Sequence, residues 1–252
     1  MRRRLLALIG LGLATASGAS AVECRDETFA DKTYSVCRVD ATQEELRLFL
    51  NDPGGTPYGT FEAVDARLAG EGLRLAFGMN AGMYHDDRSP VGLYREGGAE
   101  AQGLITSAGP GNFGLLPNGV FCFGPGYAEV IETLAFEKRG TACPNATQSG
   151  PMLVIDGALH PRFLEDSTSR YVRNGVGTSS DGKTAYFVMS GAFVTFHEFG
   201  RFFRDGLKVP QALYFDGNIS RLYAPSLGRN DFGRRMGPIV GVVEPAPEGT
   251  GG

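Results

Sequence analysis

The stretch GVGTSSDGKTAYFVMS, residues 175–190, has two largely apolar runs that flank Asp181 and Gly182. An Asp-Gly pair between such runs is among the strongest short-range signals for a β-hairpin. A second hairpin is expected over residues 113–123, where Pro117, Asn118 and Gly119 separate two apolar runs. Alternating or continuous apolar residues predict further strands at residues 34–39, 46–50, 73–79, 152–155 and 211–215.

Only two segments read clearly as helices. Thr60 can cap a helix that ends near Gly70. Residues 195–204 form the second, and Thr195 with Glu198 has the spacing of a capping box, which favours a structural role for this glutamate. The helix has an aromatic stripe expected in the core: Phe196, Phe199 and Phe203. Many strands and few helices predict an α+β fold, with a mixed or antiparallel sheet in one domain spanning residues 22–243.

The first 21 residues have the features of a secretory signal peptide. Arg2, Arg3 and Arg4 precede a short apolar run, and Ala19-Ser20-Ala21 fits a signal-peptidase site. The apolar run is shorter than the roughly 20 residues that a membrane helix needs. We therefore expect cleavage after Ala21 and a periplasmic or secreted mature chain. A lipid anchor on Cys24 is not expected, because Glu23 occupies a position that should be small.

Four cysteines remain after this cleavage, and an even number in an oxidising compartment predicts two disulfides. Three pairings exist in principle. We favour Cys24 with Cys37 and Cys122 with Cys143, because each pair closes a short local loop. The Cys-x-x-Cys spacing of a zinc site does not occur.

The charge balance excludes one class of partner. Without the three leader arginines, 21 Lys and Arg oppose 28 Asp and Glu, a net charge of −7. Nucleic-acid binding needs a basic face, so no nucleic-acid partner is expected. The tail from Glu244 to Gly252 is rich in Pro and Gly and is predicted to be disordered.

Common hydrolase and nucleotide motifs are missing. The sequence has no His-Glu-x-x-His, no Gly-x-Ser-x-Gly and no phosphate-binding loop. The side chains left as candidates for catalysis or binding are carboxylates, arginines and amides. These residue types gather in four glycine-containing segments that follow or join predicted strands: residues 79–87, 148–151, 170–177 and 215–221.

The four segments resemble motifs of the phosphodiester glycosidase family, in the same order. Asn80-Ala-Gly-Met-Tyr84 resembles its Asn-Gly-Gly-Phe-Phe, and Ser149-Gly-Pro151 resembles its Ser-Gly-Pro. Residues 173–177, Arg-Asn-Gly-Val-Gly, are similar to Arg-Thr-Ala-x-Gly. Residues 213–220 are similar to Asn-Leu-Asp-Gly-Gly-x-Ser. The resemblance covers about residues 73–243 and is greatest to a bacterial branch. Asn174 and Asn218 depart from the family pattern, so the sugar specificity is not carried over.

The resemblance implies hydrolysis of a sugar 1-phosphodiester, a reaction with definite chemical needs. The phosphate must be held by cations, and the planar fork of arginine suits this role. Arg173 is the first candidate, Arg170 the second and Arg221 the third. The oxocarbenium-like transition state needs a carboxylate, for which Asp216 is our choice. The structural alternatives are surface ion pairs for the arginines and an Asx-turn for Asp216.

Asn80 completes the expected catalytic set, by orienting a sugar hydroxyl or a phosphate oxygen. The remaining expected substrate-binding residues are Gly82, His85, Ser149, Gly150, Arg170, Gly217, Asn218 and Ser220. The glycines are expected either to adopt positive φ or to bring backbone amides close to the ligand. No cofactor is required; His85-Asp86-Asp87 leaves a calcium ion as an open alternative.

Two other functions remain open at this point. The chain could bind an envelope polysaccharide without cleaving it, or it could be a structural partner in exopolysaccharide export. Turnover of a sugar 1-phosphodiester would separate an enzyme from both alternatives.

Overall fold

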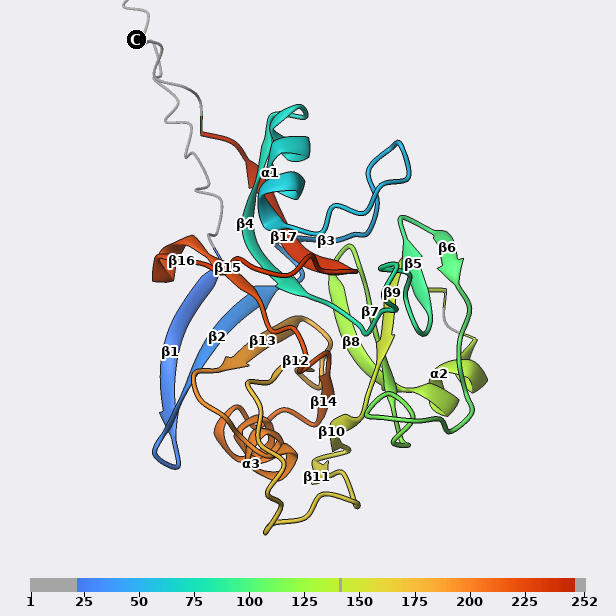
Figure 1. Ribbon diagram of the computed structural model, residues 1–252, viewed down its shortest axis with the longest axis vertical. Coiled ribbons are helices and arrows are strands. Elements are labelled where there is room, and N and C mark those ends of the chain that lie inside the picture. The colour runs from blue at the N-terminus through green and yellow to red at the C-terminus, as the bar shows by residue number, and fades with distance from the viewer. Residues whose placement is uncertain (1–21, 141, 248–252) are drawn as a thin grey trace, which may run out of the picture.

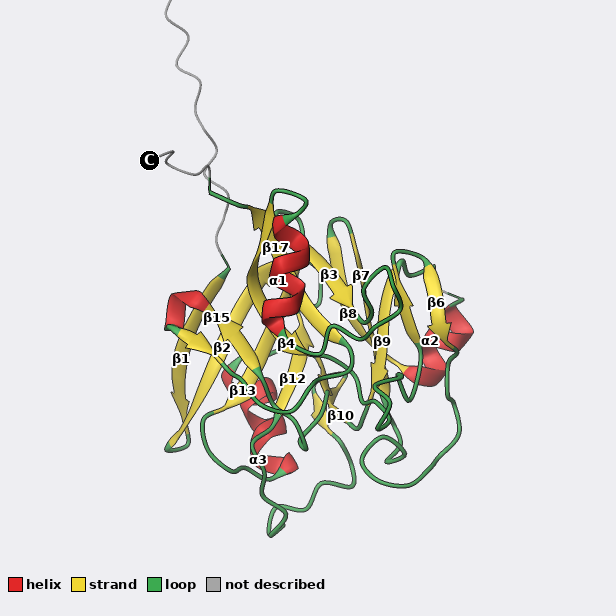
Figure 2. Cartoon of the chain, turned by 45° about the horizontal axis from the view of Figure 1, so that its top comes forward, coloured by secondary structure: helices red, strands yellow, loops and turns green. Residues whose placement is uncertain are grey.

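The computed structural model describes residues 22–140 and 142–247 (Figure 1). The predicted signal peptide, residues 1–21, lies outside the described residues. Three antiparallel sheets and a few short helices make up the fold, which confirms the expected α+β class. Figure 2 shows α1 in front of β4 and β17, α2 at the right edge and α3 at the lower end of the domain.

The largest sheet has seven strands. In spatial order they are β1 (Glu23–Phe29), β2 (Lys32–Asp40), β13 (Thr184–Ser190), β12 (Asn174–Thr178), β14 (Gln211–Tyr214), β10 (Met152–Ile155) and β11 (Ala158–Leu159). The hairpin predicted at residues 175–190 is confirmed as β12 and β13. One face of this sheet packs against α3 (Phe196–Arg201) and the π-helical turn Phe202–Gly206 that continues it.

The second sheet carries α1 (Phe61–Ala69) on one face. Its strands are β16 (Arg229–Asn230), β15 (Leu222–Ala224), β4 (Leu73–Asn80), β17 (Ile239–Pro245) and β3 (Glu45–Phe49). A 3₁₀ turn, Pro225–Leu227, lies between β15 and β16. The Thr60 side chain accepts a hydrogen bond from the Ala63 amide, so the predicted helix cap is confirmed. Three buried residues attach the helix to the sheet: Phe61, Val64 and Leu68.

Glu244 and Pro245, the first residues of the predicted tail, belong to strand β17. Glu244 and Pro245 still pair with Arg74 and Leu73 of β4. The Glu244 carboxylate also lies 2.5 Å from the Arg74 guanidinium. The disorder expected for Glu244 and Pro245 is therefore wrong, because strand pairing and an ion pair order both residues.

The third sheet holds β6 (Ala99–Gln102), β5 (Tyr94–Glu96), β9 (Asn145–Ser149), β7 (Gly119–Gly124) and β8 (Tyr127–Glu132). Helix α2 (Thr133–Arg139) packs against it through Phe136. The hairpin predicted over residues 113–123 is wrong, because β7 pairs with β8 and β9 and residues 113–116 form turns. The buried Asn118 side chain donates to the Phe113 carbonyl (2.9 Å) and accepts from the Thr133 hydroxyl (2.7 Å). It anchors this segment to the start of α2 instead of turning a hairpin.

A central core joins the three sheets. The Phe187 ring of β13 lies 4.9 Å from Phe77 of β4 and 5.6 Å from Phe121 of β7, measured between ring centroids. All three side chains are buried. Burial of each contributes roughly 1.5–3 kcal/mol, so this contact ties the sheets into one domain.

Both predicted disulfides are present. Cys24–Cys37 joins β1 to β2, and Cys122–Cys143 joins β7 to the segment before β9. Across the described part of the chain, no helix has the length and apolar character to span a membrane.

Candidate active site

Three of the four motif segments meet where strands β4, β12 and β14 end or begin. Asn80 is the last residue of β4 and Asn174 is the first of β12, and both side chains are fully buried. The Asn174 amide nitrogen donates to Asn80 Oδ1 at 2.8 Å, and the Asp216 backbone N–H donates to Asn174 Oδ1 at 3.3 Å. The Arg221 backbone N–H also donates to Asn80 Oδ1, at 2.9 Å.

The fourth motif segment joins this group through Ser149. Its hydroxyl donates to the Phe215 carbonyl at 2.7 Å, one residue before Asp216. Ser220 supports the same loop, because its hydroxyl donates to the Val172 carbonyl at 3.1 Å. The two serines thus hold the backbone around Asp216.

Asp216 lies half-buried just after β14. One carboxylate oxygen accepts a 2.9 Å hydrogen bond from the Asn218 amide, which is the Asx-turn considered above. Burial raises the pKa of Asp216, and the amides of Asn218, Gly217 and Ile219 oppose this shift. Within residues 22–140 and 142–247, no cation forms an ion pair with Asp216.

Arg173 is 1% exposed and lies under the site on the α3 face of the sheet. Its guanidinium is centred 3.6 Å from the Phe196 ring centroid and donates to the carbonyls of Val194 (2.9 Å) and Ser169 (3.1 Å). Burial lowers its pKa, while Tyr214 opposes that shift. No carboxylate of the described chain pairs with it; carbonyls, aromatic rings and the Tyr214 hydroxyl surround its charge.

Tyr84 links two further arginines, Arg88 and Arg221, to the site. Burial raises the pKa of Tyr84 to about 12; Asp216 adds to this shift, and Arg88 and Arg221 oppose it. The Arg88 guanidinium lies 5.5 Å from the centroid of the Tyr84 ring. Tyr214 similarly senses two charges, because Arg173 lowers its pKa and Asp216 raises it. Asp216 therefore lies near both tyrosines.

Six buried polar atoms in the motif segments, or one residue beyond them, have no hydrogen-bond partner among the described residues. Each can donate a hydrogen bond, and we call them the donor cluster: Asn80 Nδ2, Tyr84 OH, Arg88 Nε, Arg173 Nη1, Tyr214 OH and Arg221 Nε. A buried polar group left unpaired costs about 1–3 kcal/mol. The donor cluster is therefore suited to a ligand rich in acceptor oxygens.

The predicted glycines serve close packing instead of positive φ. None of Gly82, Gly150 and Gly217 has a positive φ. A Cβ on Gly82 would meet the Gln148 carbonyl and the Thr147 hydroxyl, each at 2.5 Å. A Cβ on Gly217 would overlap the Tyr214 hydroxyl, and one on Gly150 would lie 2.7 Å from Asn118 Cβ. The positive-φ alternative is wrong for these residues, because neighbouring protein atoms explain the missing side chain.

Three other predicted residues, Arg170, His85 and Asn218, add no buried side chain to the donor cluster. Arg170 is exposed and pairs with Glu198 at 2.7 Å, which agrees with its surface-ion-pair alternative. Glu198 also completes the capping box with Thr195, as expected. His85 and Asn218 are exposed on loops. No group of three potential metal-ligating side chains gathers within the described ranges, so the calcium alternative gains no support from residues 85–87.

Sequence reasoning missed four contributors to the site: Asn174, Tyr84, Arg88 and Tyr214. Asn174 was noted only as a departure from the family pattern, yet it links Asn80 to Asp216. Its position in a motif segment directly after Arg173 was the available signal. The unpaired hydroxyls of the two tyrosines depend on tertiary packing and had no such signal.

The fold and site define a three-sheet α+β domain with a carboxylate set among unpaired donors at the ends of its strands. The model of the phosphodiester glycosidase family matches residues 74–243. The chain belongs to the phosphodiester glycosidase family.

Relatives agree with this assignment. Over 205 residues the chain is 33% identical to "Uncharacterized protein YigE" of Escherichia coli K12, covering 81% of this chain and 80% of that protein. The catalytic domain of zebrafish N-acetylglucosamine-1-phosphodiester alpha-N-acetylglucosaminidase has a similar fold, with TM-score 0.60, 12% identity, and coverage of 90% of this chain and 84% of that one.

A hypothetical protein from Synechocystis shares the fold with TM-score 0.58 and 13% identity. The alignment covers 87% of this chain but 61% of that protein, so this chain spans about three fifths of its length. At these identities the two solved structures show the fold alone.

Proposed function

We propose that the chain is an exported hydrolase that cleaves a sugar 1-phosphodiester, or a related linkage in a cell-envelope glycan or exopolysaccharide. The observation that carries this proposal is the donor cluster, whose residues lie in or next to the same motif segments as Asp216. A phosphodiester supplies the acceptor oxygens and the negative charge that these donors lack. Membership of the phosphodiester glycosidase family supports the same reaction class.

The arginines suit the phosphate. Arg173 offers a buried, unpaired Nη1, and Arg88 and Arg221 each offer an unpaired Nε. Charge-assisted hydrogen bonds from these groups would hold the phosphate oxygens as the bond to the anomeric carbon breaks. A phosphate monoester is a weakly basic leaving group, so it needs little protonation, and fixed positive charge is the main requirement.

Asp216 suits the anomeric carbon. A carboxylate there either attacks the carbon or accepts a proton from the attacking water, and both roles stabilise an oxocarbenium-like transition state. The Asx-turn occupies only Oδ1, so the other carboxylate oxygen carries this role. Asn80 Nδ2 would donate to a sugar hydroxyl; the hydrogen bonds from Asn174 and Arg221 to the Asn80 amide oxygen support this role, because they fix the amide.

Export to the periplasm or beyond is the location that fits this activity. The leader-like residues 1–21 and the two disulfides support it, since disulfides persist in oxidising compartments.

The test is release of reducing sugar from a set of sugar 1-phosphodiesters by the purified chain from residue 22. We expect Asp216→Asn to lower kcat by about a thousandfold or more, as loss of a carboxylate that meets the reacting carbon would. Asp86→Asn changes an exposed loop carboxylate and is the matched control. Wild-type turnover by Asp216→Asn would refute the assignment. Saturable glycan binding by the wild type with no turnover would favour a polysaccharide-binding protein instead.

A further inference from the structure

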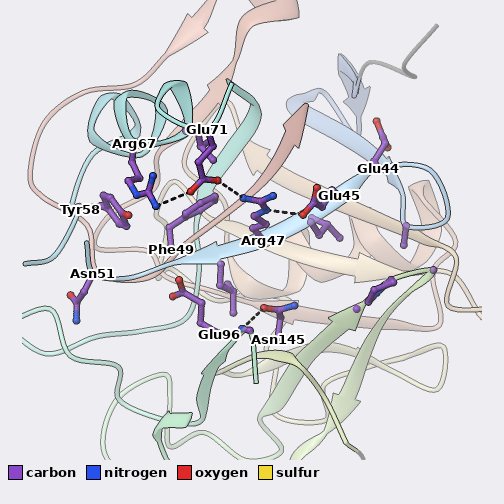
Figure 3. A pocket seen from close by; sticks show the side chains of 18 of the residues that line it. Glu44, Glu45, Arg47, Phe49, Asn51, Tyr58, Arg67, Glu71, Glu96 and Asn145 are labelled. Carbon is purple, nitrogen blue, oxygen red and sulfur yellow. Dashed lines mark hydrogen bonds and ion pairs between the residues drawn. The ribbon is translucent and has the colours of Figure 1, made fainter. Parts of the chain in front are cut away.

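A cavity of about 810 Å³ lies between the second and third sheets and includes no residue of the four motif segments (Figure 3). Two arginines line it, and both are ion-paired. Arg67 pairs with Glu71 at 2.8 Å, and Arg47 pairs with Glu71 at 3.4 Å and with Glu45 at 2.8 Å. Figure 3 draws these pairs as dashed lines. The cavity therefore offers no unneutralised arginine to a phosphodiester, in contrast to the donor cluster.

The loop of residues 231–237 packs against two residues of the donor cluster. A Cβ on Gly233 would overlap the Arg221 guanidinium, and a Cβ on Gly237 would overlap the Tyr84 ring. The two glycines therefore bring the loop backbone into direct contact with these side chains. Because most of the loop is also exposed, it forms part of the rim of the candidate active site.

Hydrogen bonds hold this loop at both ends. The Asp231 amide donates to the Leu222 carbonyl at 3.0 Å, and the Leu222 amide donates to Asp231 Oδ2 at 3.0 Å. Near the other end, the Met236 amide donates to the Gly59 carbonyl at 2.8 Å. The fold therefore fixes the backbone of the exposed residues between these points.

Phe232 is the most exposed large apolar side chain in the described part of the chain, at 89%. Its Cα lies one peptide, about 3.8 Å, from that of Gly233, whose backbone contacts Arg221. A water-exposed ring gains free energy when an apolar group covers it. A ring held at this place therefore favours a ligand that has an apolar part next to its phosphate.

Three arginines near Tyr84 supply positive charge for that phosphate. Burial raises the pKa of Tyr84, and Arg88, Arg221 and Arg234 oppose this shift. In the part of the chain that the structure describes, none of the three forms an ion pair with a carboxylate. Arg234 follows Phe232 by two residues, so the loop presents both an apolar ring and an unneutralised cation.

A sugar 1-phosphodiester has three parts in a fixed order: the sugar, the phosphate and the leaving-group alcohol. The pKa of Tyr84 responds to Asp216, assigned above to the sugar, and to Arg221, assigned to the phosphate. The next group, reached from Arg221 through Gly233, is the exposed ring of Phe232. The order of these groups therefore matches a sugar, a phosphate and an apolar alcohol.

We propose that the 231–237 loop selects the leaving group, and that the preferred substrate is a sugar 1-phosphodiester of an aliphatic alcohol. This inference rests on the function proposed above. The bond from the anomeric carbon to the phosphate oxygen breaks. The oxygen and one proton of water end on the sugar, and the other proton ends on the alkyl phosphate. Phe232 contacts the alkyl chain, while Arg221 and Arg234 contact the phosphate.

The test compares methyl and hexyl diesters of each sugar 1-phosphate in the set used above, with the chain from residue 22. Release of reducing sugar gives kcat/KM for each diester. We expect the hexyl diester to be preferred at least about tenfold, a factor that burial of roughly two methylene groups provides. Phe232→Ser should remove this preference, with an unchanged thermal midpoint because the ring is exposed in the free protein.

Two further variants serve as controls. Leu134→Ser removes another exposed apolar side chain, on α2, and should keep the full preference for the hexyl diester. Phe232→Leu keeps an apolar side chain and should keep most of it. The two substrates are compared within each variant, so a general change in activity cancels from the ratio.

The outcomes separate this inference from the proposed function. Hydrolysis of both diesters with equal efficiency would overturn the inference and leave the proposed function standing. A full preference in Phe232→Ser, or loss of the preference in Leu134→Ser, would do the same. Equal efficiency together with Phe232-dependent binding to anionic lipid vesicles would overturn it in favour of a membrane-binding loop. No hydrolysis of either diester would overturn the proposed function and this inference with it.

Discussion

Arg173→Met tests whether the buried guanidinium binds the phosphate. Methionine keeps much of the apolar volume against Phe196 but removes the charge and all donors. A charge-assisted hydrogen bond is worth about 1.5–3 kcal/mol, so losing the Nη1 contact should weaken binding of a sugar 1-phosphate roughly 10- to 150-fold.

The effect on folding should be much smaller than the number of lost contacts indicates. The hydrogen bonds to the Val194 and Ser169 carbonyls and the contact with the Phe196 ring are lost. Their loss is offset by relief of the cost of burying an unpaired charge, which is several kcal/mol. We expect the free energy of unfolding to change by less than about 3 kcal/mol.

The assay is calorimetric binding of a sugar 1-phosphate, with urea denaturation to measure the free energy of unfolding. Arg170→Met is the matched control, because it removes the same charge from an exposed ion pair with Glu198. Such pairs contribute at most about 1 kcal/mol, so neither binding nor stability should change much. Wild-type affinity in a folded Arg173→Met, or equal losses in both variants, would refute the reasoning.

Three further outcomes are expected. Activity should fall as pH decreases through the pKa of Asp216, because the ionised carboxylate reacts. Burial raises this pKa, so the loss of activity in acid should occur at a higher pH than for an exposed aspartate. Asp216→Asn should remove this acid limb from the pH–activity profile. Gly217→Ala should destabilise the fold by about 1–3 kcal/mol in urea denaturation, because its Cβ meets the Tyr214 hydroxyl; adding Tyr214→Phe should restore much of the loss, and a double variant no more stable than Gly217→Ala would contradict the packing argument. Replacing Cys122 and Cys143 by Ala should lower the free energy of unfolding by about 3 kcal/mol, given the loop of 21 residues that they close, whereas an unchanged denaturation midpoint would argue against this bond.

Local chemistry explains which parts of the fold could be predicted. The cap at Thr60 and the capping box at Thr195 depend on residues within one turn of a helix, and both are confirmed. The β12–β13 hairpin was predictable because Asp181 and Gly182 specify a tight turn between strands adjacent in sequence. The grouping of strands into three sheets was not predictable, since it depends on long-range contacts such as those of Phe187.

The hairpin prediction for residues 113–123 was wrong for the same reason, because long-range contacts decide the structure there. Asparagine is common in turns, but the Asn118 side chain is hydrogen-bonded to Phe113 and Thr133 instead. The site was only partly predictable for a similar reason. Asp216 and Arg173 could be selected from chemistry and resemblance, whereas the importance of Asn174 follows from its hydrogen bonds across the strand ends.

Strand register explains why Asp216 and Arg173 both act on the pKa of Tyr214 although 43 positions separate them in sequence. Gly175 lies opposite Tyr214 in the antiparallel pair β12–β14, and the Phe215 amide donates to the Asn174 carbonyl one step further on. The next step places position 173 opposite position 216. The backbone pairing of the two strands ends there. The Asp216 backbone amide donates to the Asn174 side chain, and the Arg173 guanidinium packs against the Phe196 ring. Ending the backbone ladder at this step leaves a carboxylate and a guanidinium near Tyr214 without an ion pair between them in the described structure. A continued ladder would bring the two groups side by side as an internal salt bridge, and the site would then have no free charge for a ligand.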